Sequence, residues 1–89
     1  MAHVHESHPQ IVNRLKRANG HLSKIIAMIE EGSPCVDVSR QLQAVYKAIG
    51  NAKSEFVRDH IEGCLTEDNA SATELKRKMH EIKEISRYL

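Results

Sequence analysis

The chain has 89 residues, a formal net charge of +1 at pH 7, and no Trp. This length suits a single small domain with a modest core, so we expect oligomerisation to bury further apolar surface. No apolar run approaches the ~18 residues of a membrane span. The N-terminus lacks the basic and apolar regions of a signal peptide, so a cytoplasmic location is expected. In that compartment, the two cysteines favour a metal or redox site over a structural disulfide.

Residues 1–7 are predicted to form a flexible polar tail, which carries His3 and His5. Ser7 and Gln10 are spaced as a capping box, and a helix is predicted to follow. Its apolar stripe has spacings of four and three and consists of Ile11, Leu15, Ala18, Leu22, Ile25 and Ile29. Gly32 is expected to end this helix and Pro34 to open the next. Because the turn is short, the two helices should pack antiparallel as a hairpin.

A second, longer helix is predicted from about residue 34 to about residue 65. Its heptad seam consists of Val38, Leu42, Val45, Ile49, Ala52 and Phe56. After a polar linker, Ser71 and Glu74 form another predicted capping box and begin a third helix. Its stripe consists of Leu75, Met79, Ile82, Ile85 and Leu89. The sequence therefore predicts an all-α, three-helix subunit that forms one domain over residues 1–89.

Three residues of the second helix are candidate metal ligands. His60 and Cys64, at i and i+4, lie on one helix face and could chelate a metal, although this spacing is also common among packing residues. Cys35 lies roughly 40 Å from His60 along the helix axis. In an antiparallel dimer, Cys35 of one subunit would lie beside His60 and Cys64 of the other. One imidazole and two thiolates suit Cu(I) and are acceptable to Ni(II), Co(II) or Zn(II).

The positive charge is concentrated in the first two-thirds of the chain. No acid occurs between Ser7 and Ile29. We predict a DNA-binding surface made of Arg14, Lys16, Arg17, Lys24 and Lys53. The alternative is an ordinary solvated basic face. Neither a catalytic triad nor a Gly-rich phosphate loop is present, so we do not expect an enzyme.

Several segments together resemble the CsoR/RcnR superfamily of bacterial metal-sensing repressors. They are residues 14–17 (RLKR), 20–22 (GHL), 35–38 (CVDV), 41–45 (QLQAV) and 59–64 (DHIEGC). The resemblance implies a dimer of antiparallel hairpins, a tetramer made of two dimers, and pairing of Cys35 with His60 and Cys64 across the dimer. It also implies that the apo-protein binds double-stranded operator DNA, that Arg14 contributes to this binding, and that the effector releases it.

The resemblance also bears on the effector. Pro34 stands where copper sensors typically have Tyr, and His3 stands where the nickel and cobalt branch has a ligand. We therefore expect Ni(II) or Co(II) ahead of Cu(I), with release from DNA derepressing metal efflux or resistance genes. His80 or Glu81 is a candidate for a supporting group behind the ligands. Two alternatives stay open: a cysteine-based persulfide or formaldehyde sensor, and a small metal-binding protein without a DNA role.

Overall fold

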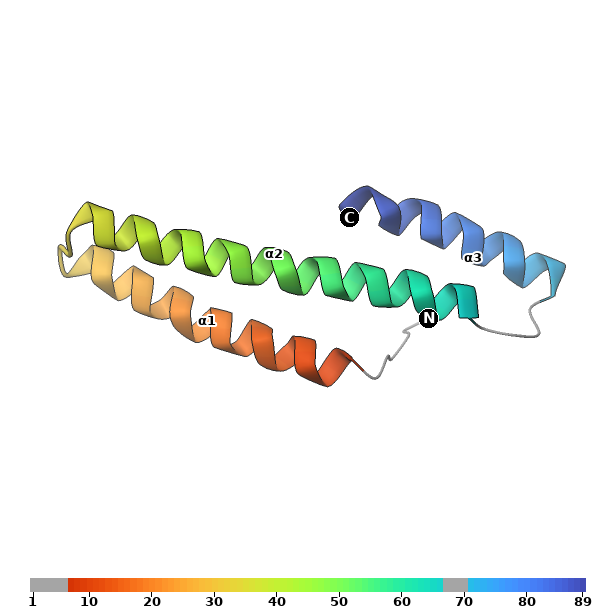
Figure 1. The fold of residues 1–89 in the computed structure, drawn as a ribbon, viewed down its shortest axis with the longest axis horizontal. Helices are drawn as coiled ribbons and strands as arrows, with labels where there is room; N and C mark the ends of the chain where they lie inside the picture. The colour runs from red at the N-terminus through yellow and green to blue at the C-terminus, as the bar shows by residue number, and fades with distance from the viewer. Residues whose placement is uncertain (1–6, 67–70) are drawn as a thin grey trace.

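The computed structural model describes residues 7–66 and 71–89, with the side chains of residues 64–66 outside that description. The elements are α1 (His8–Glu30), α2 (Cys35–Thr66), α3 (Ala72–Ile85) and a final 3-10 turn, η1 (Ser86–Tyr88). Figure 1 shows α1 and α2 as an antiparallel hairpin, with α3 folded back along the distal half of α2. The described residues contain no strand, so the prediction of an all-α, three-helix subunit is confirmed.

The turn between α1 and α2 forms as predicted, and α1 begins directly after Ser7 as predicted, but without the expected capping box. Gly32 adopts φ 76°, and the N–H of Ser33 donates to the carbonyl of Met28 at 2.9 Å. The expected capping box at Ser7 is wrong, because the Ser7 backbone is itself helical (φ −75°, ψ −16°) and its side chain makes no capping hydrogen bond. A capping hydroxyl normally needs an extended backbone to reach the next turn.

The third helix begins as its sequence predicts. Ser71 is extended (φ −66°, ψ 165°), and its hydroxyl accepts a hydrogen bond from the backbone N–H of Glu74 at 3.2 Å. This helix covers the distal part of α2, where Val57 is only 4% exposed. The long helix therefore packs against α1 along its first part and against α3 near its end.

The apolar stripes of α1 and α2 divide into two halves. Every second member is buried between the helices, namely Ile11, Ala18, Ile25, Val38, Val45 and Ala52. The members between them are exposed by about two-fifths, namely Leu15, Leu22, Leu42, Ile49 and Phe56. Successive residues of a stripe lie alternately at the line where the two helices touch and to one side of it. Only every second residue can therefore face the partner helix. One side of the hairpin is thus apolar and exposed in the single chain.

Over the described residues, none of the helices combines the length and apolar character that crossing a membrane requires. The amphipathic stripes account for this, because each helix carries charged side chains on the face away from its neighbour.

Replacing Gly32 by Ala should lower the free energy of unfolding by about 1 kcal/mol, because a Cβ is strained at φ 76°. Urea denaturation followed by circular dichroism measures the change. Gly20→Ala is the matched control, since a Cβ at Gly20 meets nothing within 4 Å. That control should raise stability by up to about 1 kcal/mol. A neutral or stabilising Gly32→Ala would contradict this account of the turn.

Candidate metal centre and nucleic-acid interface

His60 is held between α2 and α3. It is 7% exposed, and its Nε2 donates to Oε1 of Glu81 on α3 at 2.9 Å. Of the two supporting groups suggested by the sequence, the structure brings Glu81 to His60, while His80 is exposed. A carboxylate on one imidazole nitrogen holds the ring in one orientation, which is how metal-binding histidines are commonly supported.

Cys35 lies at the other end of the same helix. It is the first residue of α2 and its thiol is free and exposed. Cys35 and His60 are roughly 40 Å apart along the helix axis, and the described residues of the single chain include no group of three or more His, Cys, Asp and Glu that could hold a metal ion. Cys35 and His60 of one subunit therefore cannot bind the same metal ion.

The remaining predicted ligands are only partly placed. Cys64 lies one helical turn after His60 on α2, but its side chain is outside the described part of the chain. His3 and His5 also lie outside the described residues. The start of α1 is near the His60 end of α2, because the His8 ring stacks on Phe56 with centroids 5.0 Å apart and planes at 16°. Phe56 precedes His60 by one turn.

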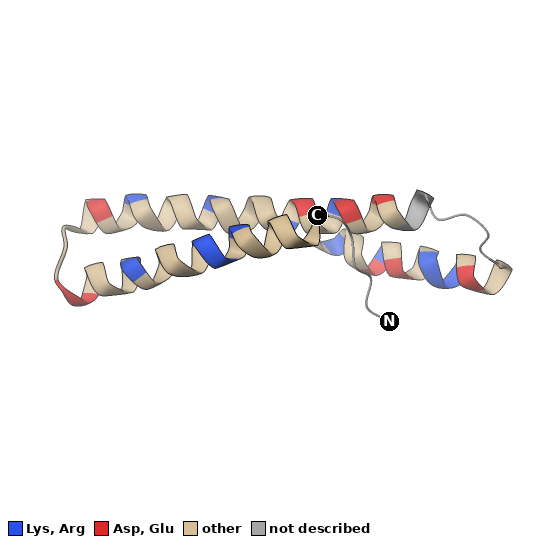
Figure 2. Ribbon diagram, turned by 90° about the horizontal axis from the view of Figure 1, so that it is seen from below, with Lys and Arg blue, Asp and Glu red and all other residues tan. Residues whose placement is uncertain are grey.

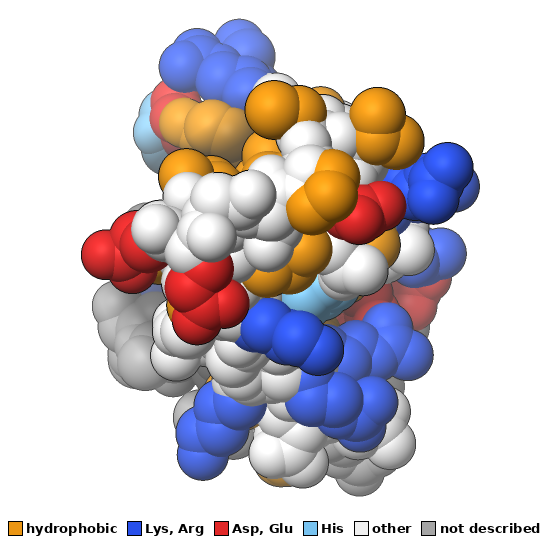
Figure 3. Space-filling model, turned by 90° about the vertical axis from the view of Figure 1, so that its left-hand side faces the viewer, with side chains coloured by type: hydrophobic (Ala, Val, Ile, Leu, Met, Phe, Trp, Pro, Cys, Tyr) orange, Lys and Arg blue, Asp and Glu red, His pale blue; other side chains and the backbone are white. Residues whose placement is uncertain are grey.

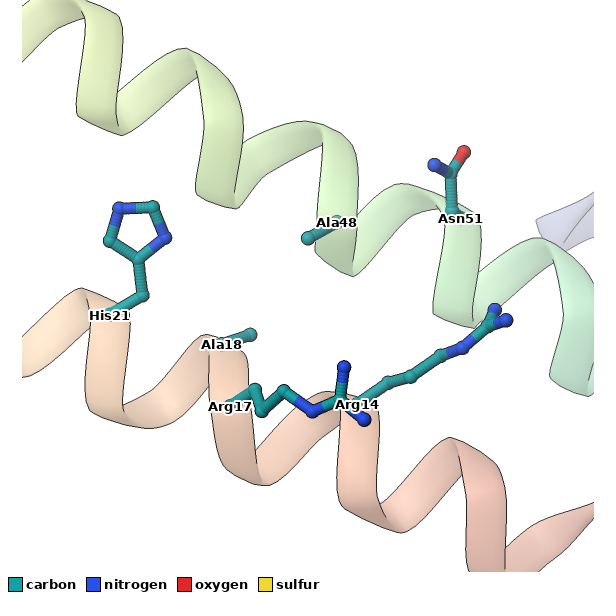
Figure 4. A pocket seen from close by; sticks show the side chains of 6 residues that line it. All are labelled: Arg14, Arg17, Ala18, His21, Ala48 and Asn51. Carbon is teal, nitrogen blue, oxygen red and sulfur yellow. The ribbon is translucent and has the colours of Figure 1, made fainter.

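A groove between α1 and α2 lies on the side of the hairpin opposite the exposed apolar residues. Its volume is about 390 Å³, and it is lined by Arg14, Arg17, Ala18, His21, Ala48 and Asn51. Figure 4 shows the Arg14 side chain reaching toward α2, while Arg17 lies alongside α1. We call this the Arg14 groove.

Two side-chain pairs bridge the helices on this side. Arg14 forms an ion pair with the carboxylate of Glu55, and Nε2 of His21 lies 2.5 Å from Oε1 of Gln41. Neither pair was expected from the sequence. Helical spacing could have suggested them, since Gln41, Ala48 and Glu55 recur every seven residues and share one face of α2.

The predicted basic surface is only partly gathered at the Arg14 groove. Arg14 and Arg17 also line an adjoining groove with Gln10 and Asn13. Lys16, Lys24 and Lys53 are exposed but line neither groove. At about 100° per residue, Lys16 points to the far side of α1 from Arg14. Lys53 is displaced from Asn51 around α2 by the same amount.

The charge distribution follows the sequence. Figure 2 shows Lys and Arg along α1, with the acids of that helix confined to the end at the turn. Viewed from the hairpin end, Lys and Arg side chains gather on the lower right of the molecule, on the side of α1 (Figure 3). A duplex carries dense negative charge, and this basic face is the one on which the sequence predicts DNA binding.

Comparison with known proteins gives matches in sequence and in structure. The copper-sensing transcriptional repressor CsoR of Mycobacterium ulcerans is 44% identical over 55 residues, which cover 62% of this chain and 47% of the relative. CsoR of Bacillus subtilis is 38% identical over 58 residues, which cover 65% of this chain and 57% of the relative. The matched part thus spans about half the length of these curated relatives.

The structural likeness extends over the whole chain. The nickel-responsive transcriptional regulator InrS superposes with a TM-score of 0.76 and 32% identity, covering 100% of both chains. A single-residue variant of the formaldehyde-responsive regulator FrmR from Salmonella enterica serovar Typhimurium gives a TM-score of 0.82 and 28% identity, covering 99% of this chain and 100% of that one. The family model for metal-sensitive transcriptional repressors matches residues 7–88. The chain therefore belongs to the CsoR/RcnR family, whose members are repressors rather than enzymes.

Proposed function

We propose that this protein is a repressor whose metal-free tetramer binds operator DNA. The tetramer is released from the DNA when Ni(II) or Co(II) binds between its subunits. Cu(I) is the alternative effector, and release derepresses metal efflux or resistance genes. The observation that carries the proposal is that α2 carries both the buried His60 and the exposed Cys35. The His60 ring is held by Glu81 of α3. Membership of a metal-sensitive repressor family supports it.

The exposed apolar side of the hairpin supports an antiparallel dimer. Leu42 and Phe56 each lie seven residues from Ile49 along α2, and all three are exposed by 41–43%. A two-fold axis at Ile49 would place Leu42 of one subunit opposite Phe56 of the other. Burying five such side chains from each subunit supplies the apolar contact that a small domain lacks.

The same axis would also bring the proposed metal ligands of two subunits together. Cys35 and Gly63 each lie fourteen residues from Ile49. In this register, Cys35 of one subunit lies opposite the segment of the other that carries His60 and Cys64. The site then has one imidazole and two thiolates and is repeated twice in each dimer. Coordination through Nδ1 of His60 would preserve the hydrogen bond from Nε2 to Glu81.

The choice of metal depends on the donors that complete this site. Two thiolates and one imidazole accept either a soft Cu(I) ion or Ni(II) and Co(II). The N-terminal end of α1 packs near the His60 end of α2 through His8 and Phe56. This arrangement favours recruitment of His3 or His5 as a further nitrogen donor, which would suit Ni(II) or Co(II). The full-length likeness to a nickel-responsive regulator supports the same order.

The DNA-binding surface of the proposal centres on Arg14 and Arg17. Both line the two grooves on the polar side of the hairpin, away from the apolar side assigned to the dimer. Lys16, Lys24 and Lys53 add exposed charge around them. A tetramer presents four copies of this surface, so operator affinity should fall steeply with salt.

A cysteine-based sensor is the second candidate function. The exposed thiol of Cys35 and the likeness to a formaldehyde-responsive regulator favour it. Such a sensor has no role for a buried His60 that a carboxylate supports, so the cysteine-based sensor is the second candidate. Mass spectrometry after persulfide or formaldehyde treatment separates the two, because adducts that abolish DNA binding at low dose, together with weak metal affinity, would favour the cysteine-based sensor.

Cys35→Ala should keep the affinity of the metal-free protein for its own promoter DNA and lose metal-driven release. In the unmodified protein, saturating metal should weaken binding by about 5- to 150-fold. Fluorescence anisotropy under anaerobic conditions measures both values with Ni(II), Co(II) and Cu(I). Ser33→Ala, two residues earlier, is the control and should behave like the unmodified protein. Release that survives Cys35→Ala would contradict the intersubunit site.

Ile49→Glu should convert the protein to monomers, because two carboxylates would meet at the proposed two-fold axis. Sedimentation velocity measures the change. Ser54→Glu adds the same charge to an exposed position on another face of α2 and should leave the dimer intact. A dimer that survives Ile49→Glu would rule out an axis at this residue.

Glu81→Gln should weaken metal binding by about 10- to 100-fold, since loss of the supporting carboxylate leaves the His60 ring less basic and less well oriented. Competition with a chromophoric chelator measures this affinity. Glu84→Gln is the matched control, because Glu84 pairs with Arg87 at 3.8 Å instead. Equal metal affinities for the two variants would remove Glu81 from the site.

A further inference from the structure

Arg14, one of the two arginines at the centre of the proposed DNA surface, already forms an ion pair with Glu55. Arg14 belongs to α1 and Glu55 to α2, so the pair closes across the hairpin on its polar side. The Arg14 side chain is 51% exposed and that of Glu55 is 22% exposed. The guanidinium is thus accessible to solvent while one carboxylate already engages it.

We propose that Glu55 is an internal competitor for DNA phosphate. In the free protein its carboxylate holds Arg14 across the hairpin, and DNA must displace it to gain the guanidinium. Glu55 thereby sets the operator affinity of the metal-free repressor below the value that its cations alone would give. This inference rests on the proposed operator binding.

The chemistry of the two partners supports the competition. A guanidinium offers its donors in a planar fork that fits a carboxylate and a phosphate in the same bidentate way. The same donors therefore serve one oxyanion or the other. The position of Glu55, one helical turn after Asn51, puts its carboxylate at the end of the Arg14 groove.

Glu55 differs in charge from the residues that line the neighbouring grooves. None of the residues that line the Arg14 groove or the adjoining groove is acidic. Glu55 is also the first acid to follow the acid-free stretch that runs from Val38 to Ser54. Glu55 therefore brings a carboxylate beside grooves whose own lining residues are neutral or basic, and it engages one of the two arginines that line both grooves.

The expected strength of the pair suits a contact that DNA can open. Exposed ion pairs contribute little, because water and salt screen both charges. Removing the competition should therefore tighten binding by about two- to fivefold for each subunit that contacts DNA. The gain multiplies with the number of subunits engaged, so a weak contact in one subunit has a larger effect in the assembly.

Glu55→Gln in the full chain tests the proposal, with Asp37→Asn as the matched control. Both changes remove one negative charge from α2, but Asp37 pairs with Arg40 at 4.0 Å near the turn and not with Arg14. Binding to a labelled duplex of the protein's own promoter is measured without metal and at fixed salt. We expect Glu55→Gln to bind about two- to fivefold tighter per engaged subunit, and Asp37→Asn to change affinity by less than half as much.

A double-mutant cycle with Arg14→Gln separates competition from overall charge. If Glu55 acts through Arg14, adding Glu55→Gln to Arg14→Gln should produce no gain in affinity beyond that of Asp37→Asn. An equal gain in the presence and absence of Arg14 would overturn the proposal. So would equal effects of Glu55→Gln and Asp37→Asn in the otherwise unmodified protein.

Elution from heparin agarose keeps this test independent of the proposed function. Heparin offers dense sulfate groups without any operator sequence, and the competition predicts a higher elution salt for Glu55→Gln than for Asp37→Asn. If the unmodified protein fails to bind promoter DNA at low salt, the proposed repressor function falls while this comparison still decides the role of Glu55. Identical elution of the two variants would overturn that role.

Discussion

The rigidity and length of α2 are the constraint on which the rest of this structure depends. Cys35 and His60 lie on one continuous helix, about 40 Å apart. A helix cannot fold back to join its own ends, so any site that uses both residues must involve a second subunit. The proposed sensing mechanism follows from this separation, because a ligand that bridges subunits can change how they are arranged.

The division of the apolar stripes determines how a second subunit could pack. One half of each stripe forms the core of the hairpin, and the other half remains exposed on one side. The polar side carries Arg14, Arg17 and the bridging pairs. One hairpin thus separates a surface suited to self-association from a surface suited to an anion, which allows both to operate at once.

The contacts that join the helices differ in their burial. His60 and Glu81 link α2 to α3 where His60 is almost fully enclosed. Arg14 and Glu55 link α1 to α2 where solvent reaches both side chains. A buried hydrogen bond is costly to break, whereas an exposed ion pair is readily exchanged. The first contact is therefore suited to holding a ligand in place and the second to giving way when DNA binds.

The sequence by itself determined the helices and the turn, because hydrophobic spacing, Gly32, and the Ser71 cap are local signals. It also singled out Cys35, His60 and Arg14 as candidate site residues, because their chemistry is a property of the residue type. Only the tertiary structure decided which half of each stripe is buried, that Glu81 rather than His80 reaches His60, and that Glu55 pairs with Arg14. These depend on how helices rotate and pack against one another, and periodicity within one helix does not specify that rotation.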